Sequence, residues 1–161
     1  MLGEHRYAIE LEWEGDRGEG TASYRAYGRQ HAVRADGKLH EIAGSSDRAF
    51  HGDRDRWNPE ELALAALSQC HMLSYLHVAT NHGVVVVGYT DAATATMHED
   101  GRGGGRLVEA VLRPRVVVAE PGMRELADAL HHEASEKCFI AASVNFPVRH
   151  EPVALVRGID G

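Results

Sequence analysis

The sequence contains few cysteines, few lysines and few aromatic residues. Only two of its 161 residues are cysteines, Cys70 and Cys138, which excludes a framework of several disulfides. Only two are lysines, and the 17 Lys and Arg residues are outnumbered by 24 Asp and Glu, giving a net charge of −7. Because binding to phosphates needs a basic face, we expect no nucleic-acid partner.

The sequence also lacks a run of the roughly 20 apolar residues that would span a bilayer. Residues 1–6 carry no apolar core of the kind found in a signal peptide. We therefore expect a cytoplasmic protein without a membrane partner. Hydrophobic residues make up 43% and charged residues 25%, which is ordinary for a globular chain, and the length fits one domain over residues 1–161.

The first third of the chain is predicted to form β-strands. Residues 7–13 alternate apolar and polar side chains, which is the period of a half-buried strand. Further strands are expected over 21–27 and 30–34, with turns at 15–20 and 35–37. Residues 45–56 are polar and are expected to form a loop.

A long apolar helix is predicted over residues 59–81. Asn58 is a favourable N-cap, Pro59 suits the first helical position, and Glu61 has the spacing of a capping box. Apolar residues surround most of this helix, so we expect it to be buried on more than one side. Gly83 follows the last turn and can take the left-handed conformation that ends a helix.

The remaining residues are predicted to form a β segment over 84–97, a glycine-rich hairpin at 101–105 and strand residues over 107–118. A second helix follows Pro121 and Gly122, with an apolar stripe that ends at Cys138. Residues 139–146 are irregular, and 148–156 form a last strand. This order of elements predicts an α+β fold.

The 11 histidines do not indicate a metal site, and the glycine-rich run does not indicate a phosphate-binding loop. His71, His77 and His82 lie on the first helix at steps of six and five, which do not place ligands on one helical face. We expect most histidines at the surface or in loops. No Gly-x-Ser-x-Gly elbow occurs, and the glycines at 103–105 are not followed by the Lys-Ser/Thr of a phosphate loop.

The two cysteines are either buried small hydrophobes or reactive thiols. A reactive thiolate needs a nearby cation, and Cys70 lies too far into its helix for the helix dipole alone. An arginine must therefore come from elsewhere, and a buried arginine needs a carboxylate such as Glu60. Glu60 precedes Cys70 by ten residues, or ~15 Å along one helix. If they share a site, a second copy of the chain must bring them together, which predicts a dimer.

Asn58-Pro59-Glu60-Glu61-Leu62, the small residues Ala65 and Ala66, and then Cys70 resemble the OsmC/Ohr family of osmotically inducible and organic hydroperoxide resistance proteins. The resemblance continues through the glycine-rich hairpin to the second cysteine. It implies that Cys70 is the peroxidatic thiol, Cys138 the resolving thiol and Glu60 the motif glutamate. Arg29 best matches the family's arginine, with Arg17 and Arg48 as alternatives.

The resemblance also implies antiparallel β-sheets around two central helices in an intertwined homodimer. The implied activity is a thiol peroxidase that reduces organic hydroperoxides, and hydrogen peroxide more weakly, without metal or other cofactor. An external dithiol, of lipoyl type in some branches, would then reduce the Cys70–Cys138 disulfide. A redox sensor or a small-molecule binding dimer on the same scaffold is the alternative, and a third reading makes both cysteines core residues.

Overall fold

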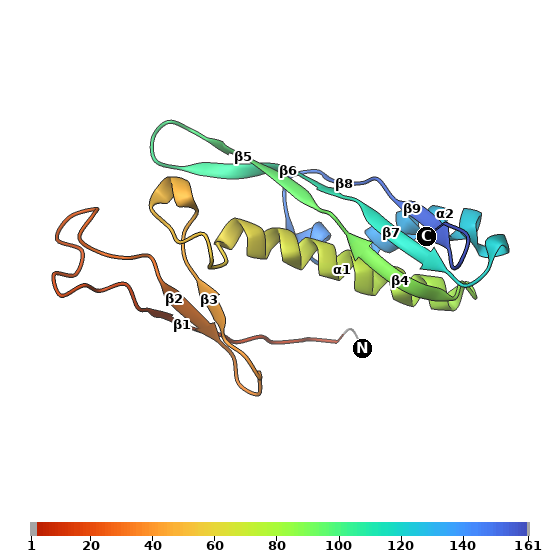
Figure 1. Cartoon of the computed structure of the whole chain (residues 1–161), viewed down its shortest axis with the longest axis horizontal. Coiled ribbons are helices and arrows are strands. Elements are labelled where there is room, and N and C mark those ends of the chain that lie inside the picture. Colours follow the sequence, from red (N-terminus) through yellow and green to blue (C-terminus); the bar gives the residue numbers. More distant parts are fainter. Residues whose placement is uncertain (1–2, 161) are drawn as a thin grey trace. The chain divides into compact units, whose positions relative to one another are not determined.

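The computed structural model describes residues 3–160 and divides the chain into two compact units, one ending at Leu62 and the other beginning at Ala63. Each unit is described by itself. In the first, an antiparallel sheet has the order β1 (Glu10–Trp13), β2 (His31–Arg34) and β3 (Ile42–Gly44) (Figure 1). A short 3₁₀ helix, η1 (Arg48–Phe50), follows in the polar segment.

The loop between β1 and β2 replaces the strand that was predicted over 21–27, and this prediction is wrong. The loop is closed at its base, where the Trp13 indole donates to the Gly28 carbonyl (2.9 Å) and the Gly28 amide donates to Gly15 (2.7 Å). Gly18 and Gly20 have positive φ, and their amides donate to the Asp16 carboxylate. Successive turns between residues 19 and 26 then satisfy the backbone locally, so no strand partner is needed.

The second unit contains most of α1 (Pro59–Asn81), whose predicted bounds and caps are confirmed. The Asn58 carboxamide accepts from the Glu61 amide (2.8 Å), and the Glu61 carboxylate accepts from the Asn58 amide (3.2 Å), forming the predicted capping box. Gly83 ends the helix at φ 72°. Along α1 the fully buried face repeats at helical spacing and comprises Leu67, His71, Tyr75, Val78 and Ala79.

Two mixed three-stranded sheets accompany α1. One has the order β4 (Val86–Asp91), β7 (Pro114–Val118), β9 (Val153–Val156), and the other β5 (Thr94–Glu99), β6 (Gly105–Leu112), β8 (Val148–His150). Pairs β4–β7 and β5–β6 are antiparallel, whereas β7–β9 and β6–β8 are parallel. The α+β fold is therefore confirmed, but these two sheets are mixed, and the predicted strands over 84–97, 107–118 and 148–156 are each divided in two.

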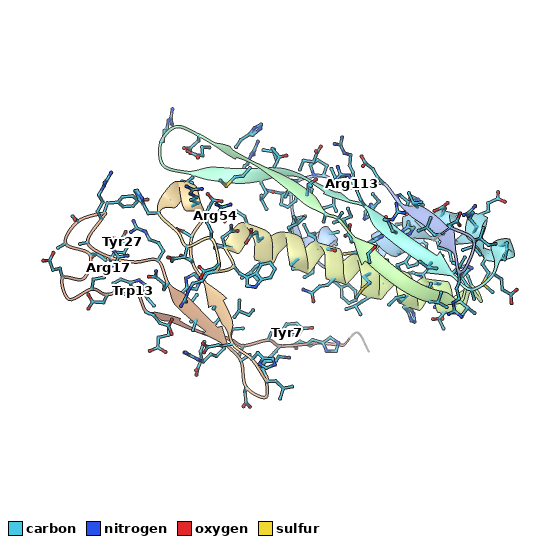
Figure 2. All side chains as sticks on the ribbon, viewed as in Figure 1. Tyr7, Trp13, Arg17, Tyr27, Arg54 and Arg113 are labelled. Carbon is cyan, nitrogen blue, oxygen red and sulfur yellow. The ribbon has the colours of Figure 1, made fainter. Side chains whose placement is uncertain are left out.

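All three divisions fall at one line across the strands: after Asp91, at Arg113, and at residues 151–152. Arg113 lies on this line (Figure 2). Its backbone amide donates to the Asp91 carboxylate (2.7 Å), and its guanidinium donates to Thr94 Oγ1 and to the Glu151 carboxylate (both 2.9 Å). Side-chain contacts thus join the two sheets where the backbone ladders stop.

The core of the second unit lies between α1, α2 (Arg124–Glu136) and the β4–β7–β9 sheet (Figure 1). The short helix η2 (Pro121–Met123) leads into α2, and η3 (Ala141–Ser143) follows it. Tyr75 is fully buried, and its hydroxyl donates to the Ala127 carbonyl of α2 (2.9 Å). The hydrophobic residues around it are Val78, Ala79, Val84, Val116, Val118, Ala127, Leu130, Ala134, Ala154 and Val156.

By length and composition α1 is apolar enough to cross a membrane, contrary to the expectation that no segment would be. Core helices of soluble proteins have the same composition. Tyr75 and Val78 of this helix, each 0% exposed, pack into the core of the second unit. The buried face of α1 therefore serves this core, whereas 28% of the most apolar window of the helix is buried.

Candidate active site

Cys70 and Cys138 lie together in the second unit, although 68 residues separate them in sequence. Cys70 is half-buried in the middle of α1, and Cys138 is 1% exposed just after α2. Both are free thiols, and Cys70 is near enough to Cys138 to raise the pKa of its thiol. One turn after Cys70, the Ser74 hydroxyl donates to the Lys137 carbonyl (3.3 Å). This contact holds the segment that carries Cys138 against α1.

Cys138 lies in a tight turn and not at the end of the second helix, where it was predicted. Helix α2 ends at Glu136, and the Cys138 carbonyl accepts from the Ala142 amide (3.0 Å). Burial and the neighbouring Cys70 thiol raise the pKa of the Cys138 thiol to about 11, against the opposing effect of the Ala141 and Ile140 amides. Cys138 is therefore protonated at neutral pH, which leaves the more accessible Cys70 as the thiol suited to first attack.

Next to Cys70, a buried cluster of imidazoles crosses the core. His71 Nε2 lies 3.0 Å from His131 Nδ1, and the His71 and His150 rings are 4.1 Å apart. The His131 ring also stacks on Tyr75 at 4.0 Å. His71 and His131 are 0% and 3% exposed, so these two are exceptions to the expectation that most histidines lie at the surface or in loops.

This cluster is neutral at pH 7. Burial, followed by the neighbouring His150 and His131, lowers the pKa of His71 to about 3. Burial, followed by His150, lowers the pKa of His131 to about 4. Within residues 3–160, no group of three or more His, Cys, Asp or Glu side chains is arranged to hold a metal ion. The cluster was not predicted from the sequence, although His71 falls on the same helical face as Leu67 and Tyr75.

Arg29, the predicted active-site arginine, lies in the first unit and is held by two tyrosines. Its terminal nitrogens donate to the Tyr27 carbonyl (2.5 Å) and the Tyr24 carbonyl (2.8 Å). Its guanidinium carbon lies 4.2 Å from the Tyr27 ring centre and 4.4 Å from that of Tyr24. Arg17 shares a cavity with Arg29, whereas Arg48 begins η1.

Glu60, the predicted partner of that arginine, lies half-buried in the first turn of α1. In the part of the chain that the structure describes, its carboxylate makes no hydrogen bond or ion pair with Arg29, Arg17 or Arg48. Because α1 is unbroken from Glu60 to Cys70, the two residues are ~15 Å apart along the helix. The structure therefore brings together the two cysteines, and the roles of Arg29 and Glu60 stay predictions.

Comparison with known proteins supplies the remaining observation. The family model described as OsmC-like protein matches residues 51–152. The chain belongs to the OsmC-like family. The matched residues include Glu60, Cys70 and Cys138, whereas Arg17, Arg29 and Arg48 lie before them.

Solved structures agree with this assignment. An OsmC-like protein of unknown function from Vibrio cholerae has a TM-score of 0.82 and 30% identity, with 93% of this chain and 100% of that chain covered. An organic hydroperoxide resistance protein OsmC from Legionella pneumophila has a TM-score of 0.67 and 18% identity, over 95% and 100% of the two chains. One from Elizabethkingia anophelis, with thiocyanate bound, has a TM-score of 0.65 and 17% identity, over 96% and 100%. No curated protein matches this OsmC-like chain.

Proposed function

We propose that this OsmC-like protein is a cytoplasmic thiol peroxidase that reduces organic hydroperoxides, and hydrogen peroxide more weakly, to alcohols or water. The observation that supports it most is that two free thiols are neighbours, with Cys70 half-buried on α1, Cys138 fully buried, and the Cys138 pKa raised in part by Cys70. A pair of core cysteines would not require such a contact. Two-cysteine peroxide reduction does, because the second thiol must reach the oxidised sulfur of the first.

The first step transfers one oxygen atom. The Cys70 thiolate attacks the terminal peroxide oxygen, the O–O bond breaks, and the alkoxide leaves as an alcohol after taking up a proton. Cys70 is then a sulfenic acid. The raised pKa of Cys138 keeps this second thiol protonated and unreactive toward peroxide until the sulfenic acid forms beside it.

The second step forms the disulfide. Cys138 loses its proton and attacks the Cys70 sulfur, the S–O bond breaks, and water leaves. An external dithiol, such as one of lipoyl type, reduces the Cys70–Cys138 disulfide by thiol–disulfide exchange. The external dithiol is itself oxidised to a disulfide. No metal or other cofactor takes part in these steps.

In this proposal Arg29 stabilises the Cys70 thiolate and positions the peroxide, and Glu60 orients Arg29. Each chain's Glu60 serves the Cys70 of a second copy in a homodimer. Two observations support the dimer: the ~15 Å between Glu60 and Cys70 along α1, and exposed apolar side chains along one edge of the first unit. These side chains are Tyr7 (91% exposed), Ile9 (65%), Leu11 (62%) and Trp13 (43%).

The test measures consumption of cumene hydroperoxide by reduced protein with a dithiol, for the wild type, Cys70→Ser and Cys138→Ser. Circular dichroism confirms that each variant is folded. We expect Cys70→Ser to fall to the rate of the dithiol alone. Cys138→Ser should react with peroxide and then accumulate sulfinic acid, visible by mass spectrometry as two added oxygen atoms, because no second thiol captures the sulfenic acid.

A wild type no faster than Cys70→Ser would contradict the proposal. The thiol pair would then be explained by the redox-sensor or binding alternative. Mild oxidation separates these two alternatives. A redox sensor should still form the Cys70–Cys138 disulfide, whereas a binding protein need not.

A further inference from the structure

The loop between β1 and β2 and the C-cap of η1 line an open cavity of about 250 Å³ in the first unit. Its lining is three arginines, one tyrosine and one histidine: Arg17, Arg25, Tyr27, Arg29 and His51. No acidic residue contributes to this lining. In Figure 2, Arg17 and Tyr27 are both seen in this loop, near Trp13. A cavity with three guanidinium groups is unexpected in a chain whose net charge is −7.

Several acidic residues of the same unit are engaged elsewhere. Arg34 pairs with Glu12 (2.7 Å) and Glu41 (2.8 Å), and Glu14 lies 3.5 Å from Arg56. By contrast, no carboxylate within residues 3–160 lies close enough to form an ion pair with Arg17, Arg25 or Arg29. Within residues 3–160 of a single chain, the cationic charge of the cavity is thus not balanced by a carboxylate; Arg29 is shared with the proposed peroxidase site, whereas Arg17 and Arg25 belong to the cavity alone.

The nearest acid in sequence does not neutralise the cavity either. Asp16 precedes Arg17, but its carboxylate accepts the amides of Gly18 (2.8 Å) and Gly20 (2.9 Å). These backbone hydrogen bonds hold the pKa of Asp16 below its usual value. Asp16 therefore shapes the loop that presents Arg17.

Two of the lining side chains are held in place before any ligand arrives. The Arg29 guanidinium lies against the rings of Tyr24 and Tyr27 and donates to both of their carbonyls. A guanidinium has five N–H donors, so others are left for a ligand. His51 has a left-handed backbone (φ 65°) as the C-cap of η1, and its ring lies 5.2 Å from that of Tyr24. Fixed donors lose little conformational freedom on binding.

We propose that this cavity binds an oxyanion, the carboxylate or phosphate group of a small molecule. Guanidinium groups donate to both kinds of oxyanion in a bidentate manner, and three of them would supply the charge that the cavity lacks. Its volume is below the ~300 to 1,000 Å³ of pockets that enclose drug-sized ligands. The cavity therefore takes an anionic head group, with the remainder of the ligand outside it.

The test titrates the full chain with inorganic phosphate and, separately, with acetate, followed by intrinsic fluorescence and calorimetry. Trp13 donates to Gly28 and its ring lies 5.9 Å from Tyr27, so it reports on the loop. We expect saturable binding that weakens with added salt. Which of the two anions binds more tightly distinguishes a phosphate ligand from a carboxylate ligand.

The decisive variants remove two charges each. Arg17→Gln/Arg25→Gln should weaken binding at least about tenfold. The control, Arg102→Gln/Arg106→Gln, removes two exposed arginines from the β5–β6 hairpin and should bind as the wild type does. Arg25→Gln alone serves if the double variant does not fold. Absence of saturable binding, or equal weakening by both double variants, would overturn the proposal. The readout is binding, so the result is independent of peroxide turnover.

Discussion

Acidification from pH 7 to pH 5 should destabilise the protein because His71 and His131 are buried as neutral imidazoles. Their pKa values in the folded protein are about 3 and about 4, lowered mainly by burial, whereas a histidine in the unfolded chain has a pKa of ~6.5. Between these values the unfolded state binds protons that the folded state does not. The free energy of unfolding therefore falls as the pH falls below ~6.5.

The magnitude follows from the same pKa values. At pH 5 an unfolded histidine is almost fully protonated, while both folded imidazoles stay mostly neutral. Each residue then removes about 2 kcal/mol between pH 7 and pH 5. Together they remove about 4 kcal/mol, which is large against the roughly 5 to 15 kcal/mol that stabilises a typical domain.

Urea unfolding at pH 7, 6 and 5, at constant protein concentration, measures this loss. His131→Gln keeps a hydrogen-bonding group beside His71 but cannot take up a proton. Between pH 7 and pH 5, the free energy of unfolding of His131→Gln should fall by at least about 2 kcal/mol less than that of the wild type. His98→Gln, at an exposed position on β5, should keep the wild-type dependence. A His131→Gln protein that responds to pH as steeply as the wild type would refute the reasoning.

Two further predictions concern the thiols. Glu60→Gln chains and Cys70→Ser chains should each be inactive alone, but refolding them together should restore peroxidase activity. In a mixed dimer, an intact Glu60 from one chain meets the Cys70 of its partner. If activity is not restored, Glu60 and Cys70 do not act in one shared site. A thiol reagent at pH 8 should modify Cys138→Ser promptly at Cys70, and Cys70→Ser at least about tenfold more slowly until urea is added, because burial raises the pKa of Cys138. Equal labelling rates in the two folded variants would contradict the assigned burial.

The sequence predicted best those elements whose signals are local. Asn58, Glu61 and Gly83 define both ends of α1 through contacts within a few residues, and the structure reproduces them. The apolar alternation at 21–27 was misleading because the Trp13–Gly28 hydrogen bond and nearby turns close that loop. Such closure depends on residues that are 15 positions apart, and periodicity does not detect it.

The site was predictable in part for the same reason. The spacing from Asn58 to Cys70 is a local motif, and the resemblance supplied Cys138. The partners of His71 could not be predicted, because they are His131 from α2 and His150 from β8. The position of Arg29 likewise depends on Tyr24 and Tyr27 in a loop without regular structure. Residues brought together by packing leave no signal in local spacing.

The line at Arg113, where three pairs of strands break at one level, makes the two mixed sheets one creased surface. Along each sheet, backbone ladders set the stiffness almost regardless of sequence. At the crease, stiffness depends on the side chains of Arg113, Thr94 and Glu151. The Arg113–Glu151 ion pair is partly exposed to solvent and so is weak and sensitive to salt. Substitution of Arg113 would therefore remove these side-chain contacts and leave backbone hydrogen bonds, such as that from the Glu151 amide to the Leu112 carbonyl (2.9 Å), to hold the junction.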